Sequence, residues 1–183
     1  FYATRLYVNP AFTGNTEFGR VSAQARRQWS ALRGFTTYGA YYDQNIAQIN
    51  SGFGATILQD FSADAGLTFT KVALAYAYSF KINKKLAART GINFTYNSLR
   101  VDLSKFIFTD QFITGSSTSI DNYRFDRLRY ADFNLGGIIY NQRFWAGASI
   151  SNLRNFGRKL EGAQNPFNTK VSVHGAYLIP IKR

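Results

Sequence analysis

Residues 71–99 read KVALAYAYSFKINKKLAARTGINFTYNSL, and this stretch decides the fold class. In its first half, bulky apolar side chains take every second position from Val72 to Phe80, while small side chains and Lys71 take the others. Such alternation indicates a β-strand with two different faces, because successive side chains point to opposite sides of a sheet. A basic turn at residues 81–85 follows, and then the alternation resumes. The stretch therefore predicts a β-hairpin.

The length of this hairpin points to a membrane. Each strand spans about ten residues, whereas about five or six is usual in soluble proteins, and about ten suffice to cross a bilayer at a tilt. The second strand places Ile92, Phe94 and Tyr96 on one face, opposite Arg89 and Asn93. We therefore predict a transmembrane antiparallel β-barrel, with the apolar faces of the hairpin toward lipid and residues 81–85 as a short periplasmic turn.

Similar alternation recurs along the chain and predicts an all-β protein. Together with the hairpin, the patterns give about eight strands, the others near residues 19–29, 35–44, 52–59, 130–140, 143–153 and 169–181. Turn signals at Asn9-Pro10 and Gly14-Asn15 predict an irregular leader over residues 1–18. We interpret residues 1–183 as one barrel domain, mature at its start and incomplete at its C-terminus, where residues 177–183 stop within a strand and turn.

The connections between these strands also favour an outer-membrane barrel. Short connections near residues 46, 81 and 141 alternate with longer ones at residues 59–66, 100–129 and 152–168. Bacterial outer-membrane barrels have short periplasmic turns and longer external loops. The first connection, near Leu32, is short where this rule expects a long one. The pattern predicts the bacterial outer membrane as the location.

Periodicity alone leaves open which face of the strands is outside. A soluble lipid-binding calyx would turn its apolar face inward, whereas a membrane barrel turns it outward. Cationic side chains opposite the apolar faces could not fill a dry core unpaired, so we assign them to the lumen: Arg20, Arg26, Lys71, Arg89 and Lys170. Aromatic residues near strand ends fit the girdles of membrane barrels: Trp29, Tyr96, Tyr140 and Phe144.

The composition of the chain indicates which ligands it could attract and excludes several kinds of site. The chain has 22 Lys and Arg against 10 Asp and Glu, a net charge of +12, and no Cys. Such a charge attracts phosphate in nucleic acid, anionic lipid or lipopolysaccharide, or lines a lumen. We expect no nucleic-acid partner, because the basic residues are scattered and the RNP pattern of RNA-binding domains is missing. Disulfides, zinc–thiolate sites and thiol nucleophiles are excluded.

No catalytic pattern stands out. His174 is the sole histidine and has no acidic residue nearby in sequence, which suits a lumen or core residue better than a catalyst. Asp60 with Asp64, and Asp121 with Asp126, could hold calcium, but solvated loop acids are the more common case. No phosphate loop, nucleophile elbow or metal signature is present. We therefore predict a protein that is not an enzyme and has no cofactor.

Several segments together resemble one family. The leader Leu6-Tyr-Val-Asn-Pro-Ala-Phe-Thr-Gly14, Gln28-Trp29, and the strands at residues 75–80 and 144–153 are similar to the PorP/SprF outer-membrane proteins of the Bacteroidetes. The motif positions are Asn9, Pro10, Ala11, Gly14, Gln28 and Trp29. Phe35 departs from the family's pattern, because a Pro is expected at this position, directly before Thr36-Thr37. Family members are longer, and the resemblance implies a barrel of about 14 strands.

The resemblance implies a role in type IX secretion and gliding motility, through export or surface anchoring of secreted adhesin-type proteins. Expected partners are a secreted cargo protein or its C-terminal domain, periplasmic or outer-membrane secretion components, and membrane lipids including lipopolysaccharide. The external loops at residues 100–129 and 152–168 are the expected docking surface. The alternative is a passive outer-membrane pore or small independent barrel whose cationic lumen selects anions.

Overall fold

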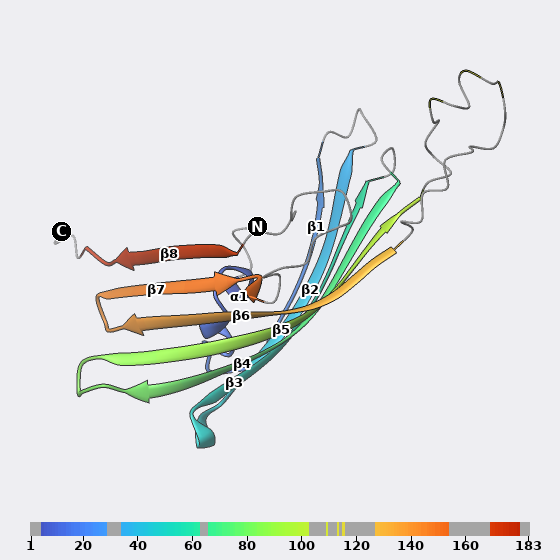
Figure 1. Cartoon of the computed structure of the whole chain (residues 1–183). Coiled ribbons are helices and arrows are strands. Elements are labelled where there is room, and N and C mark those ends of the chain that lie inside the picture. Colours follow the sequence, from blue (N-terminus) through green and yellow to red (C-terminus); the bar gives the residue numbers. More distant parts are fainter. Residues whose placement is uncertain are drawn as a thin grey trace.

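The computed structural model describes residues 5–28, 34–62, 66–102, 127–153 and 169–179, together with Thr109, Ile113 and Gly115. Eight antiparallel strands form one sheet, and neighbours in the sheet are neighbours in sequence. The strands are β1 (Arg20–Arg27), β2 (Phe35–Ile46), β3 (Ser51–Ser62), β4 (Leu67–Lys81), β5 (Ala87–Val101), β6 (Arg127–Tyr140), β7 (Phe144–Ser151) and β8 (Lys170–Tyr177). The sheet curls into half of a barrel (Figure 1), which confirms the predicted all-β antiparallel fold.

The predicted hairpin is β4 and β5. The two strands pair from Leu67 with Val101 to Lys81 with Ala87, and each has 15 residues. Both are longer than the sequence pattern indicated, because residues 67–70 and 100–101, polar and apolar alike, continue the strand pairing. At about 3.3 Å per residue, strands of this length exceed the hydrocarbon thickness of a bilayer even when tilted.

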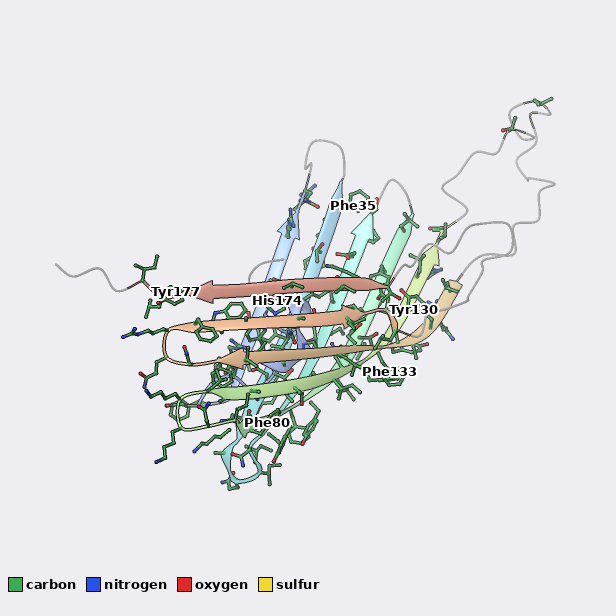
Figure 2. The ribbon with its side chains drawn as sticks, turned by 60° about the vertical axis from the view of Figure 1, so that its left-hand side comes forward. Phe35, Phe80, Tyr130, Phe133, His174 and Tyr177 are labelled. Carbon is green, nitrogen blue, oxygen red and sulfur yellow. The ribbon has the colours of Figure 1, made fainter. Side chains whose placement is uncertain are left out.

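The structure decides which face of the sheet is outside. Leu74 is 61% exposed, whereas its neighbours Ala73 and Ala75 are 3% and 8% exposed. The same holds on the other strands, where outward side chains such as Phe80 and Phe133 stand away from the ribbon (Figure 2). The convex face thus exposes large apolar side chains, whereas the concave face carries the small and polar ones together with a few buried apolar residues. This is the arrangement of a membrane barrel, and it is opposite to that of a calyx.

Connections at the two ends of the sheet differ only in part as the sequence predicted. At one end lie the 3₁₀ helix η3 (Ala47–Ile49) with Asn50, the turn at residues 82–86 and the turn at residues 141–143. We call this the short-turn end, and we call the opposite end the long-loop end. The longer loop predicted at residues 59–66 was wrong, because β3 continues to Ser62 and β4 begins at Leu67, so the connection there is as short as those at the short-turn end. The connection before β6, which begins at Arg127, is long as predicted. Most of residues 103–126 and 154–168 lie outside the described residues.

One expected girdle residue lies elsewhere. Tyr140 does not face outward but packs beside Ile138 and Phe12 on the concave side. Its position at the end of β6 suggested an aromatic girdle, but its place in the alternation puts it on the face of Ile138. Tyr96 is 44% exposed on the outer face, as expected. Trp29 lies outside the described residues. In the part of the chain that the structure describes, no helix is long and apolar enough to span a membrane.

Candidate functional site

The concave face is occupied by the start of the chain. Helix α1 (Arg5–Val8) and the 3₁₀ helix η1 (Pro10–Phe12) lie in the hollow of the curled sheet, behind β6 and β7 in the view of Figure 1. We call residues 5–14 the plug. Asn9, Ala11 and Thr13 are fully buried. The sequence predicted an irregular leader here, whereas the structure shows two short helices packed into the half-barrel.

Asn9 connects the plug to the sheet. Its Oδ1 accepts a hydrogen bond from the backbone N–H of Ala11 at 2.8 Å and so caps η1. Pro10 follows at the first helical position, where its missing N–H costs nothing. The Nδ2 atom of Asn9 donates to the carbonyl oxygens of Gly137 at 3.2 Å and Ala148 at 3.0 Å. One side-chain amide thereby caps η1 and connects the plug to β6 and β7.

A row of small residues makes room for the plug. The row crosses the sheet from β3 to β7, and each member pairs with the next: Gly52, Ala77, Gly91, Gly136 and Ser149. A Cβ atom at Gly91 would overlap the backbone of Pro10, and one at Gly136 would overlap the side chain of Asn9. Ser149 adds a hydrogen bond from Oγ to the carbonyl oxygen of Val8 at 2.7 Å. The plug therefore lies directly on the backbone of the sheet.

An apolar cluster covers the short-turn side of the plug. Phe12 packs against Ile138, with Tyr140 and Trp145 at the edge of the cluster. The rings of Phe12 and Trp145 meet edge to face, with centroids 5.3 Å apart, an arrangement that aromatic pairs favour. His174 of β8, labelled in Figure 2, lies beside both rings, with its centroid 5.8 Å from that of Phe12. The plug thus contacts strands as far along the sheet as β8.

A buried carboxylate holds the end of the plug. Asp43 is fully buried on β2, and its two oxygens accept hydrogen bonds from Arg20 Nε at 2.8 Å and Arg20 Nη2 at 3.1 Å. The backbone N–H of Gly14 donates to the same carboxylate at 2.8 Å. Gly14 has a φ of 64°, a left-handed conformation that glycine adopts without steric cost. Arg89 on β5, itself buried, donates from Nη2 to the carbonyl oxygen of Thr13.

The five predicted lumen cations divide into three groups. Arg20 and Arg89 hold the plug, directly or through Asp43. Lys71 and Lys170 line a cavity of about 110 Å³ between the plug and the sheet, and Lys71 Nζ lies 5.0 Å from the ring centroid of Tyr7. Arg26 has the same place in the alternation as Arg20 but is exposed near the end of β1.

Comparison with known protein families identifies the family of the chain. A family described as Type IX secretion system membrane protein PorP/SprF matches residues 1–182. The chain belongs to the PorP/SprF family. No curated protein matches it. The match makes the chain a membrane component of a secretion system and confirms the resemblance seen in the sequence.

Four of the six residues predicted as motif positions lie together in the plug. Asn9, Ala11 and Gly14 each make a contact that places the plug in the half-barrel, and Pro10 lies against the glycines of β5 and β6. Gln28 lies apart at the end of β1, where its backbone N–H donates to the carbonyl oxygen of Phe35 at 2.8 Å. The sixth, Trp29, lies outside the described residues.

Sequence reasoning missed Asp43 as a member of the site. The facing of the strand at residues 35–44 was ambiguous, because aromatic residues occur at both alternating positions. The sequence did hold one signal for this role: Asp43 is a carboxylate within a predicted strand. A buried carboxylate needs a cation or backbone donors beside it. Asp64, Asp121 and Asp126 lie outside the described residues. Within the described ranges, no three His, Asp or Glu side chains gather as metal ligands would.

Proposed function

We propose that this PorP/SprF chain is a non-enzymatic outer-membrane β-barrel component of the type IX secretion and gliding machinery. In this role it helps to export secreted adhesin-type proteins or to hold them on the cell surface. The observation that carries the proposal is the family match over residues 1–182. The partners are a secreted cargo protein or its C-terminal domain, other secretion components, and the surrounding lipids, including lipopolysaccharide.

The sheet supports an outer-membrane location. Its convex face exposes rows of large apolar side chains, and its concave face carries the polar and charged ones. Short turns at one end, and the long connections from β5 to β6 and from β7 to β8 at the other, fit periplasmic and external sides respectively. On this orientation the contacts of Phe12 and Gly14 lie in the periplasmic half of the half-barrel. We propose residues 100–129 and 152–168 as the docking surface on the external side.

The plug favours partner binding over the passive pore. Asn9, Ala11 and Thr13 fill the concave face where ions would pass, and Arg89, a candidate anion-selecting residue, donates to Thr13 instead. We therefore expect little steady conductance from the purified protein in planar bilayers. A pore would show open channels whose ion selectivity changes in Arg89→Gln.

The export role is tested by deleting residues 115–122, in the middle of the longest predicted external loop, in the natural host. We expect less adhesin on intact cells, measured by surface labelling, at an unchanged amount of barrel in the outer-membrane fraction. The matched control is Lys84→Ser in the exposed turn at the opposite end of β4 and β5. Unchanged surface adhesin in the deletion strain would contradict the loop assignment.

A further inference from the structure

A cavity of about 110 Å³ lies between the plug and the concave face, on the long-loop side of the row of small residues. Leu6, Tyr7 and Pro10 of the plug form one side of it. The sheet contributes the other side with polar, cationic and apolar residues, among them Lys71, Lys170, Asn93, Asn134, Tyr41 and Leu58. Its volume is that of roughly four water molecules at about 30 Å³ each, far below the roughly 300 Å³ of a drug-sized pocket.

Two lysines give this cavity its charge. Lys71 comes from the long-loop half of β4 and Lys170 from the start of β8, at the two sides of the hollow. Among the described residues, Lys71 Nζ has no carboxylate within ion-pair distance and lies over the ring of Tyr7. The buried carboxylate of Asp132 attracts Lys71 from farther away, whereas Lys170 repels it. Like charges that share a site repel each other, and a bound anion between them would remove this repulsion.

A buried amide adds hydrogen-bonding capacity. Asn93 and Asn134 are cross-strand neighbours on β5 and β6, and both line the cavity. Asn93 is 9% exposed, and its Oδ1 atom is buried without a hydrogen-bond partner. An amide nitrogen can donate to a carboxylate, so the two side chains suit an anionic ligand in the cavity.

The rest of the wall limits the kind of anion. Leu6, Tyr41 and Leu58 are buried apolar or aromatic residues beside the two lysines. An inorganic ion would leave this apolar wall against water, whereas a carbon chain would cover it. We propose that the cavity binds a carboxylate carried on a short apolar stem, with the carboxylate between Lys71 and Lys170 and the stem against Leu58. A free organic acid and the C-terminus of a peptide share this chemistry.

Binding to the purified full chain in detergent tests the proposal without any assay of export. Isothermal titration with butyrate should show saturable binding, and the neutral isostere butyramide should bind at least about tenfold more weakly, because a charged hydrogen bond is lost. A second set of titrations uses a short peptide that ends in alanine, and compares its form with a free C-terminus with its form with an amidated C-terminus. Tighter binding of the free-ended peptide than of butyrate identifies a peptide end as the source, and the reverse identifies a free acid.

Variants then locate the site. Lys71→Met and Lys170→Met should each weaken butyrate binding by about tenfold or more. Lys84→Met removes the same charge from an exposed turn and should leave binding unchanged. If Lys71→Met does not fold, Lys170→Met still decides, because Lys170 is exposed at the start of its strand. Equal binding of butyramide, or equal weakening by Lys84→Met, would overturn the proposal. Failure of export with intact butyrate binding would count against the proposed function alone.

Discussion

The Nδ2 atom of Asn9 lies 3.1 Å from Nε2 of His174, although 165 positions separate the two residues in the sequence. An amide nitrogen can only donate, so Nε2 is the acceptor in this contact. The same Asn9 side chain reaches backbone oxygens on β6 and β7. One side chain of the plug therefore joins the last three strands of the sheet, and the half-barrel and its plug form a single packed unit.

Replacement of Asn9 is predicted to release the plug. In Asn9→Leu the N–H of Ala11 loses its acceptor and the carbonyl oxygens of Gly137 and Ala148 lose a donor. Unpaired buried polar groups cost about 1–3 kcal/mol each. Because the neighbouring groups can partly rearrange, we expect the free energy of unfolding to fall by about 2–4 kcal/mol in total. Urea unfolding in detergent micelles measures the free energy, with Trp145 fluorescence reporting on the plug through its contact with Phe12.

The control for this variant is Asn15→Leu, at an exposed position directly after the plug. Its free energy of unfolding should change by less than about 0.5 kcal/mol, as is usual for surface positions. Similar losses in the two variants would show that the Asn9 contacts do not hold the plug.

Two adjacent glycines on β6 provide a sharper test of the close approach between plug and sheet. A Cβ atom at Gly136 would overlap Asn9, whereas a Cβ atom at Gly137 has its nearest neighbour at 4.0 Å. Gly136→Ala should destabilise the protein by about 1–3 kcal/mol through overpacking. Gly137→Ala should be neutral or slightly stabilising, because alanine lowers the entropy of the unfolded chain. Thermal unfolding in one detergent compares them, and equal midpoints would contradict the packing.

The outer face of the fold could be predicted from the sequence. Alternation between Val72 and Phe80 depends only on neighbouring residues, and it identified the strands and the two-faced hairpin. Periodicity alone left the exposed face open, but the cationic residues opposite the apolar ones predicted that the apolar face is outside. The structure confirms this prediction, with Leu74 outside and Ala73 inside. Tyr140 was placed wrongly in a girdle, because nearness to a strand end was given more weight than its place in the alternation.

The plug could not be predicted from local patterns. Asn9-Pro10 and Gly14 are turn signals in isolation, and their burial depends on contact with strands far along the chain. A signal did exist in the strand register, because Gly91 and Gly136 are cross-strand partners in one row of small residues. That row becomes visible only when the pairing of five successive strands, β3 to β7, is known.

The Arg20–Asp43 pair is predicted to contribute measurably to stability. Both oxygens of the buried carboxylate accept from the guanidinium, and Gly14 N–H adds a third hydrogen bond. Bidentate, partly buried pairs are stronger than surface ion pairs. A double-mutant cycle with Arg20→Met and Asp43→Asn should give a coupling energy of about 1.5–3 kcal/mol. A cycle with Arg26→Met and Asp43→Asn is the control and should give a coupling close to zero. Equal couplings in both cycles would mean that the pair has no special role.

The outward face of β4 distinguishes a membrane barrel from a protein in water. Leu74 is the central residue of β4 and is 61% exposed, so Leu74→Lys meets no steric obstacle. In water the change would be close to neutral, whereas a lysine on the lipid face at the bilayer midplane costs about 2–4 kcal/mol. The matched control is Thr90→Lys, which is also exposed but lies near the short-turn end of β5, where the cost falls to about 0–1 kcal/mol. Folding into lipid vesicles from urea measures both variants. A Leu74→Lys variant as stable as Thr90→Lys would place this face outside the hydrocarbon core.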